Sequence, residues 1–400
     1  MNFGAPGRGP RTAEKPPPNT LAGASPCGSG LAGALASLCH KRYSAMVYGD
    51  DVDVLRPEQV QATNRMEPDM HARIALTALA ALIAAACGGA SGPQDAAVEA
   101  SPVALFSDDP GRTRLGELRY AGGLELTSDH EAFGGWSAME LSADGARLLA
   151  LSDSATWMTA RLSYENGALS GLDQVRLAPL LGPDGGPLGG QSADAEGLAS
   201  LGDGRYAVSF EREHRIALFQ IGEDWSGLET ATETAFPAPP GADRLRDNAG
   251  MEALAINGTR LYAGVEDPIV SGQPHTLWVY DLAAPAAPPR ALFLEIEPGF
   301  GLTAMTFGPD GALYLVERFW SRDTGNTIHV SRLSPAQIEA AASAPLQPER
   351  LAEIGPQMTV DNIEAAAFAE VDGAPLLLLM SDDNFNAAQR TLLLAFRLDL

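Results

Sequence analysis

Apolar and polar positions alternate in short runs along residues 102–400, and one pattern recurs five times. Each unit has a short apolar segment, a turn carrying Asp-Gly or Asn-Gly, and a second apolar run that ends in an acidic residue. Asp-Gly or Asn-Gly between two apolar runs predicts a β-hairpin, because its tight turn needs positive φ angles. The five units begin at Ser137, Glu196, Glu252, Thr303 and Glu364.

Further apolar runs after most hairpins extend each unit to a predicted antiparallel sheet of three or four strands. The unit starts are separated by between 51 and 61 residues. Four-stranded repeats of about 40–50 residues are typical of a β-propeller. We therefore expect an all-β propeller of five to seven blades, with six favoured because residues 115–126 supply another strand. A β-sandwich is the competing architecture, but it does not explain the repeat. A serine cap and an early proline predict a short helix over 334–343.

The composition changes before the repeats. Residues 1–69 are rich in Gly, Pro and Ala without a strand or helix period, which indicates a disordered arm or a wrongly assigned gene start. Residues 70–87 combine a short cationic start, an apolar run and small residues, as a secretory signal does. The apolar run over 74–86 is shorter than the ~20 residues that span a bilayer; a buried Ala-rich helix is the alternative. Residues 88–101 resemble a tether, which leaves 102–400 as the folded domain.

The end of the predicted signal carries a cysteine. The sequence before Cys87 resembles a bacterial lipoprotein box, and acyl chains on this cysteine would partition into a bilayer. Ala84, Ala85 and Ala86 would equally serve an ordinary signal peptidase. We expect an exported protein, periplasmic or an outer-membrane lipoprotein, whose contact with membrane is limited to a lipid at Cys87. No cysteine follows Cys87, so the exported part has no internal disulfide.

The negative charge lies entirely in the predicted exported part. Residues 70–400 contain 20 arginines, no lysine and 44 acidic residues, and they carry the whole net charge of -24. An acidic protein without compensating basic patches is repelled by a phosphate backbone, so we expect no nucleic-acid partner. The expected partner is a small molecule.

The repeat predicts that many carboxylates converge. The start of the first strand and the end of the second lie side by side in a hairpin, and the first strand of each propeller blade lines the central channel. This places three carboxylate pairs around one funnel: Glu196 with Glu211, Glu252 with Glu266, and Glu364 with Asp382.

Converging carboxylates need a neutralising group. One possibility is a hard cation such as Ca²⁺, which takes six to eight oxygen ligands. The candidate ligands for this cation are Glu196, Glu252, Glu364, Asp361 and Asn248. Arginine is the other possibility, and three arginines beside the acidic positions are candidates for holding an anionic substrate group: Arg212, Arg318 and Arg390. Any single acid at a strand end can instead cap a turn or pair with an arginine of the next blade.

Other common chemistries have no matching motif in the predicted domain. It lacks a Gly-x-Ser-x-Gly elbow, a phosphate-binding Gly-x-x-x-x-Gly-Lys loop and a Cys/His cluster for zinc. Its four histidines are widely scattered. Carboxylate chemistry is therefore the main candidate.

Several segments together resemble the family called "esterase-like activity of phytase". They include 192–199, 208–216, 248–255, 315–319, 361–364 and 381–394, and the resemblance spans roughly residues 115–400. It implies an exported bacterial protein with a hydrolytic site. The positions that it implicates are Glu196, Glu211, Glu252, Glu317, Glu364, Asp382 and Asp383. Two segments depart from the family pattern, 134–139 and Glu364-Ala365, and their added bulk would narrow the funnel.

Two functional hypotheses follow. The first is a hydrolase of phosphate or other esters that holds a cation with funnel carboxylates, so that the cation polarises the ester and acidifies a water. Its candidate catalytic residues are Glu211, Glu317, Asp382 and Asp383. The second is a non-catalytic propeller that binds a ligand or partner in the cell envelope.

Overall fold

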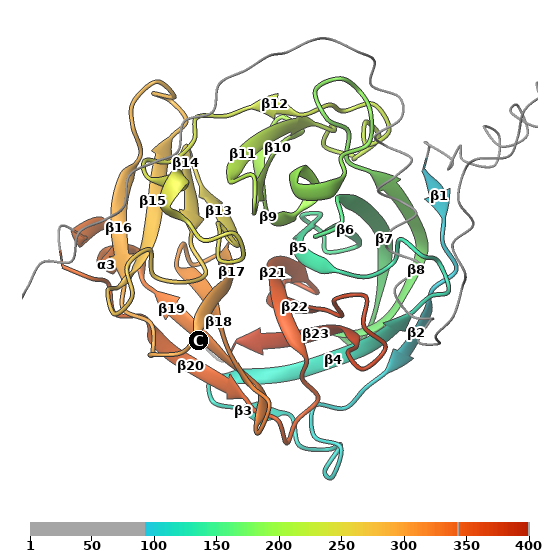
Figure 1. Ribbon diagram of the computed structural model, residues 1–400. Coiled ribbons are helices and arrows are strands. Elements are labelled where there is room, and N and C mark those ends of the chain that lie inside the picture. Colours follow the sequence, from blue (N-terminus) through green and yellow to red (C-terminus); the bar gives the residue numbers. More distant parts are fainter. Residues whose placement is uncertain (1–92, 342–343, 399–400) are drawn as a thin grey trace, which may run out of the picture. The chain divides into compact units, whose positions relative to one another are not determined.

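The computed structural model describes residues 93–341 and 344–398, which form five antiparallel sheets around one axis (Figure 1). The predicted all-β propeller is confirmed. The predicted upstream extension, the signal segment and Cys87 lie outside the described residues.

Each sheet is one blade, and in blades 1 to 4 the four main strands follow one another outward from the centre in chain order. Blade 1 contains β5 (Trp136–Leu141), β6 (Arg147–Ser152), β7 (Thr156–Glu165) and β8 (Ala168–Pro179). Blade 2 contains β9 (Ala195–Gly202), β10 (Arg205–Phe210), β11 (Arg215–Gln220) and β12 (Thr234–Ala235). Blade 3 contains β13 (Ala253–Asn257), β14 (Arg260–Gly264), β15 (His275–Asp281) and β16 (Arg290–Leu294). Blade 4 contains β17 (Gly301–Phe307), β18 (Leu313–Ser321), β19 (Gly325–Leu333) and β20 (Glu349–Ile354).

Blade 5 joins the two ends of the described chain. Its strands are β21 (Asn362–Val371), β22 (Ala374–Asp382), β23 (Thr391–Leu398) and β4 (Leu118–Thr127). β4 pairs antiparallel with β23, with Leu124 opposite Leu393 and Leu118 opposite Leu398. The expected sixth blade is therefore wrong, because the strand assigned to it completes the fifth blade. The pairing closes the ring and covers the edge that β23 would otherwise expose.

Three short strands add to the outer edges of blades 1 and 5. β1 (Gln94–Asp95) pairs with β8, and β2 (Glu99–Pro102) and β3 (Arg114–Leu115) pair with β4. β1 and most of β2 fall within residues 88–101, the predicted tether. Part of that segment is thus held by backbone hydrogen bonds, which a reading of composition alone does not detect.

The hairpin turns reverse the chain with two different backbone conformations. Asp203-Gly204 and Asp372-Gly373 have positive φ at both residues, as the sequence predicts. In the turns of blades 1 and 4 only the glycine is left-handed. There the aspartate side chain, Asp144 or Asp310, accepts a hydrogen bond from the backbone N–H two residues later.

The hydrophobic core is divided among the contacts between neighbouring blades. Five main clusters of buried side chains each combine residues of two adjacent blades. Strands of the middle positions, such as β10 and β22, are consequently apolar on both faces rather than alternating. No blade can bury its faces alone, so the ring folds as a unit.

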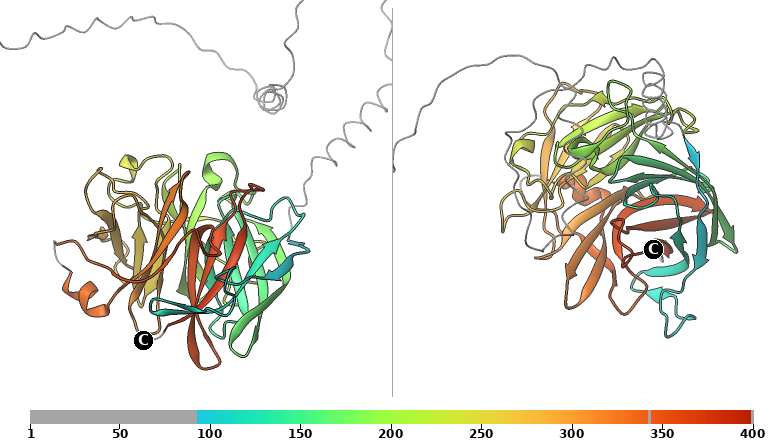
Figure 2. Two further views of the ribbon diagram at one scale, coloured as in Figure 1. Left: turned by 90° about the horizontal axis from the view of Figure 1, so that it is seen from below. Right: turned by 45° about the vertical axis from the view of Figure 1, so that its right-hand side comes forward.

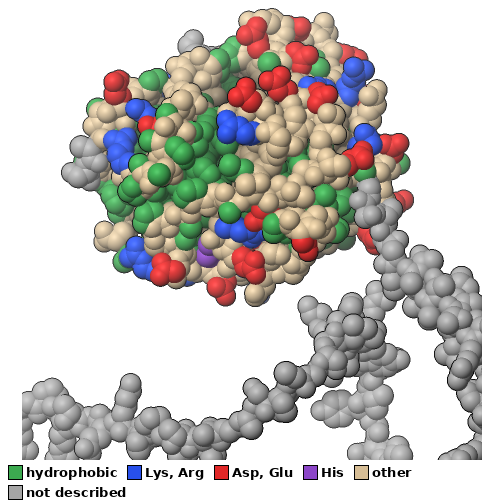
Figure 3. All heavy atoms as spheres, turned by 90° about the horizontal axis from the view of Figure 1, so that it is seen from above, with side chains coloured by type: hydrophobic (Ala, Val, Ile, Leu, Met, Phe, Trp, Pro, Cys, Tyr) green, Lys and Arg blue, Asp and Glu red, His purple; other side chains and the backbone are tan. Residues whose placement is uncertain are grey.

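The predicted short helix is confirmed as α3 (Pro335–Ala340), where Ser334 and Gln337 form a capping box. No helix among the described residues is long and apolar enough to cross a membrane. Acidic side chains are scattered over the side of the propeller drawn in Figure 3, with arginines between them. Much of the acidity on this side is therefore ordinary solvated surface.

The inner strands β5, β9, β13, β17 and β21 surround the axis, as the ribbon views show (Figures 1 and 2). Small residues from these strands, including Gly197, Ala253, Ala304 and Ala365, border a central cavity of about 10 Å³. That volume is about one water molecule. The axis is too narrow for a substrate to pass through, so a ligand must approach from one end.

Candidate functional site

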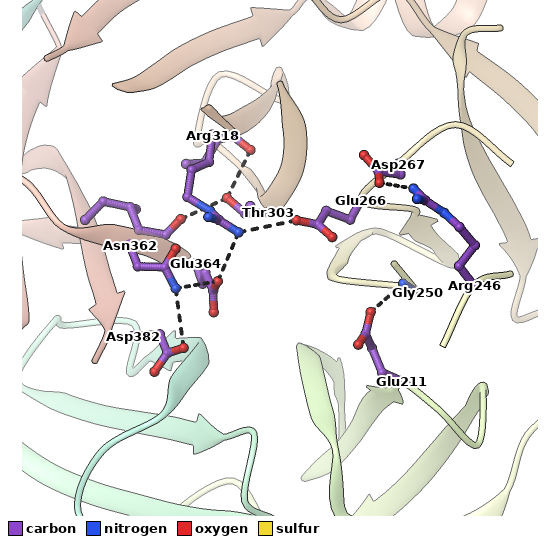
Figure 4. A network of polar contacts seen from close by, with 12 residues as sticks. Glu211, Arg246, Gly250, Glu266, Asp267, Thr303, Arg318, Asn362, Glu364 and Asp382 are labelled. Atoms are coloured by element: carbon purple, nitrogen blue, oxygen red, sulfur yellow. Dashed lines mark hydrogen bonds and ion pairs between the residues drawn. The ribbon is translucent and has the colours of Figure 1, made fainter. Parts of the chain in front are cut away.

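One end of the propeller collects the acidic residues that begin inner strands and follow or end second strands (Figure 4). Glu211 follows β10 and lies beside Glu196, near the start of β9. Glu266 follows β14 and lies beside Glu252, which immediately precedes β13. The predicted pairing within these hairpins is confirmed, because antiparallel register brings the two ends together.

Glu364 and Asp382 form the third predicted pair, in blade 5. The side-chain amide of Asn362 joins them: its Nδ2 donates to Glu364 Oε1 at 2.8 Å and to Asp382 Oδ2 at 3.4 Å. Asn362 lies opposite Asp382 in the β21–β22 register. This pair is also confirmed, and Asn362 holds its geometry.

Glu211 is shared by two groups of three carboxylates. In the first group, one oxygen each from Asp194, Glu196 and Glu211 lie within 4.8 Å of one another. In the second, the same holds for Glu211, Glu252 and Glu266. The backbone N–H of Gly250 donates to Glu211 Oε1 at 2.6 Å and fixes its orientation. Blades 2 and 3 thereby contribute to one continuous group of carboxylates, the acidic cluster, which consists of Asp194, Glu196, Glu211, Glu252 and Glu266.

Burial and mutual repulsion disfavour the charged forms of these acids. Glu196 is 7 % exposed and Glu252 is 9 % exposed. Burial raises the pKa of both groups well above the usual value, and the nearby carboxylates raise it further. Burial also raises the pKa of Glu266 to about 7, against the lowering effect of Arg318. The cluster needs protons or a cation as a counter-charge.

Arg318 is the arginine that enters the acidic cluster from blade 4. Its Nη2 lies 3.3 Å from Glu266 Oε1 and 3.5 Å from Glu364 Oε1 (Figure 4). The guanidinium thus links the acids of blade 3 to those of blade 5. Burial raises the pKa of Glu364 well above its usual value, and the nearby Asp382 raises it further, against the lowering effect of Arg318.

Asp382 and Asp383 differ in their surroundings. Asp382 accepts a hydrogen bond from the backbone N–H of Asn384, and burial raises its pKa to about 6. Asp383 accepts from the backbone N–H of Gly135 at 3.0 Å and from the hydroxyl of Thr391 at 2.8 Å. Asp383 therefore fastens the loop after β22 to the entry of blade 1.

The segment 134–139 begins at this loop contact, with the two glycines that it shares with the family pattern. Gly135 has a φ of 65°, and a Cβ there would lie 2.1 Å from Asp153 Oδ1. Burial and neighbouring acids, with Asp382 and Asp194 first among them, raise the pKa of Asp153 to about 7. Glycine thus allows a further carboxyl group to approach the same end of the ring.

Some of the predicted site residues lie apart from the shared cluster. Glu317 is buried beside His329, whose Nδ1 is 3.6 Å away; the other ring nitrogen contacts Glu353. Asp361 accepts the backbone N–H of Arg390 at 3.1 Å, and the Arg390 side chain donates to the Val360 carbonyl. These contacts hold strands and loops together.

Two further predicted residues lie at the margin of the cluster. Arg212 forms an ion pair with Asp194 and is about half exposed. Asn248 is exposed, two residues before Gly250, and its predicted role as a cation ligand stays a prediction.

Three acids at this end were not among the predicted cation ligands and catalytic residues: Asp153, Asp194 and Glu266. Asp153 and Glu266 occupy the same position of the repeat as Glu211, at the end of the second strand. Asp194 lies two residues before Glu196. The repeat position already paired Glu266 with Glu252, and the same signal could have identified Asp153.

The donor set fits a hard divalent cation. Every candidate ligand is a carboxylate oxygen, as Ca²⁺ prefers. Glu196 is more than nine-tenths buried, and one oxygen of its carboxylate lies in the first group. Glu211 is among the groups that raise the pKa of Glu252, which favours protons at this group when no cation is bound. A cation between them would displace those protons.

Comparisons with known proteins give a family for this chain. The WD40 repeats of RRP9 match 76 % of this chain and 99 % of their own, at 10 % identity and a TM-score of 0.34. A protein described as a "putative gluconolactonase" matches 75 % of this chain and 93 % of its own, at 13 % identity and a TM-score of 0.37. No curated protein sequence matches. The model of the phytase-like family, described as "esterase-like activity of phytase", matches residues 131–385, which include all five inner strands and the whole acidic cluster, so the chain belongs to this family.

Proposed function

We propose that the protein hydrolyses esters, phosphate esters in particular, at the acidic end of its propeller. The observation that carries the proposal is the pair of three-carboxylate groups that share Glu211, in which Glu196 and Glu252 are buried. The family's description supports the ester as the reacting group. A cation held by Glu196, Glu211 and Glu252 would polarise the ester oxygen and acidify a water.

Other residues near the cation would bind the substrate, act as the general base and hold the carboxylates in position. Arg318 lies between two carboxylates at the centre and can turn its guanidinium toward an anionic oxygen of the substrate. Asp382 has a pKa of about 6, which suits a general base near neutral pH. Asn362 holds Asp382 and Glu364 at a set separation through one amide group. Arg390 donates a hydrogen bond to the backbone carbonyl of Val360 and has no assigned role in the reaction.

Turnover on matched esters tests this function directly. Chelator-treated protein is assayed on p-nitrophenyl phosphate and p-nitrophenyl acetate, alone and with Ca²⁺, Mg²⁺ or Mn²⁺. We expect turnover of the phosphate ester that depends on an added cation. Absence of turnover on both esters with all three cations would refute the proposal and favour a ligand-binding propeller.

Cation binding should also change stability in a pH-dependent way. The raised pKa values mean that the folded protein binds protons more tightly than the unfolded chain. Without a cation, this contribution to stability is fully present below about pH 4 and is lost as pH rises through about 6 to 7. A cation should offset the loss. At 100 times its dissociation constant it adds about 2.7 kcal/mol, which corresponds to roughly 5 °C or more in Tm.

The measurement is the difference in Tm with and without Ca²⁺ at each pH from 5 to 8, which cancels effects of acids elsewhere. We expect the difference to grow with pH. Glu196→Gln should abolish it, whereas the exposed Glu213→Gln should leave it unchanged. A difference that is the same at pH 5 and pH 8 would contradict cation binding by these carboxylates.

A further inference from the structure

A second cavity opens beside the acidic cluster, between blade 4 and the loop that joins β22 to β23. It has a volume of about 650 Å³, within the usual range for small-molecule sites. Arg318 and Glu364 are part of its wall, and Glu364 also borders the central cavity. A molecule in this cavity would therefore have one end at the proposed reaction centre.

An exposed aromatic ring and an amide face each other on one wall. Trp320 in β18 is 58 % exposed, although large apolar side chains are otherwise mostly buried in the blades. Asn326 in β19 lies directly opposite Trp320 in the hairpin register. Directly opposed side chains on two strands are close neighbours. The Oδ1 atom of Asn326 is shielded and accepts no hydrogen bond from any described residue.

The opposite wall is built from further amides. Asn384, Asn386 and Gln389 come from the loop between β22 and β23. Asn384 and Phe385 both have left-handed φ angles, 50° and 49°, which is uncommon for residues with side chains. An amide offers both donors and acceptors, so this wall can bond several hydroxyl groups at once.

The charge of the cavity does not suit a highly anionic ligand. Arg318 is the one cationic side chain among the residues lining it, and it already contacts two carboxylates. Asp361 and Glu364 add negative charge to the same wall. Several phosphate groups would meet repulsion here, whereas an uncharged polar ring would not.

We propose that this cavity binds an uncharged, hydroxyl-rich ring, such as a sugar, as the non-reacting part of the ester substrate. The C–H face of the ring would stack on Trp320, and its hydroxyl groups would bond Asn326 and the loop amides. That the ring is part of the ester substrate rests on the proposed function. Binding of the ring itself requires no turnover.

Binding of a neutral sugar can therefore be tested separately from hydrolysis. Methyl glucoside is titrated into the full chain while tryptophan fluorescence and saturation-transfer NMR are recorded. We expect saturable binding that shifts the indole emission. Trp320→Ala should weaken it about tenfold or more, and Trp320→Phe should retain most of it. Asn326→Ala should weaken it as well.

Two controls make the result specific. Phe293→Ala removes another partly exposed aromatic side chain, outside the cavity, and should leave binding unchanged. Inositol hexakisphosphate and cyclohexanol probe the anionic and apolar alternatives. The proposal fails if methyl glucoside does not bind, if Trp320→Ala binds it as well as the natural chain, or if the hexakisphosphate binds more tightly and in a Trp320-dependent way. Sugar binding without ester turnover would instead remove only the proposed hydrolysis.

Discussion

Glu211→Gln is expected to lower cation-dependent ester turnover by at least about 100-fold, a loss typical of removing one essential catalytic group. Glu211 is the carboxylate that belongs to both three-acid groups, and the N–H of Gly250 orients it. The amide keeps the shape of the side chain but removes its charge. Both groups lose the same ligand at once, so cation affinity should fall together with turnover.

The matched control is Glu213→Gln, two residues away on the same turn. Glu213 is exposed, and its carboxylate lies 4.0 Å from the Arg215 guanidinium, which is a weak ion pair. The same change of charge there should leave turnover within about twofold, because exposed pairs contribute little. Both variants are compared at saturating and limiting cation. Equal activity of the natural chain and the Glu211 variant would rule out a central role for the shared carboxylate.

The second large effect concerns closure of the ring. Leu118 and Leu124 of β4 are fully buried and pack in different core clusters, one on each side of blade 5. Each Leu→Ala change removes about 2–5 kcal/mol. The two sites share no core cluster, so their effects should add. The double variant should lose about 4–10 kcal/mol, comparable with the whole stability of many domains.

Urea unfolding at 25 °C measures this loss. Thr127→Ala, at the exposed end of the same strand, should change the free energy of unfolding by no more than about 0.5 kcal/mol. If the double variant loses less than about 2 kcal/mol, β4 does not hold the ring closed.

The hairpins and their carboxylate pairs were predictable because the information for them is local. A turn such as Asp203-Gly204 sets the register of β9 and β10, and this register brings Glu196 and Glu211 together. The same holds for Glu252 with Glu266. Repetition of that unit was enough to identify a propeller and one acidic end.

Acids at equivalent positions of the repeat cannot be distinguished from the sequence, although their surroundings in the structure differ. Glu317 occupies the same position as Glu211, yet it is paired with His329 instead of joining the cluster. Asp361 and Arg390 support one another and the backbone of blade 5. Whether an acid joins the acidic cluster depends on whether another strand places a pairing side chain beside it. That side chain is not adjacent to the acid in the chain.

The sequence alone determined the blade as a unit, the hairpin ends that carry acids and the concentration of negative charge in residues 70–400. The tertiary structure alone decided that there are five blades, that β4 completes the last one, and that Arg318 reaches acids of both blade 3 and blade 5. The physical reason is the range of the interactions. A hairpin is set by neighbouring residues, whereas ring closure and the grouping of carboxylates around the axis depend on packing between blades that are far apart in sequence.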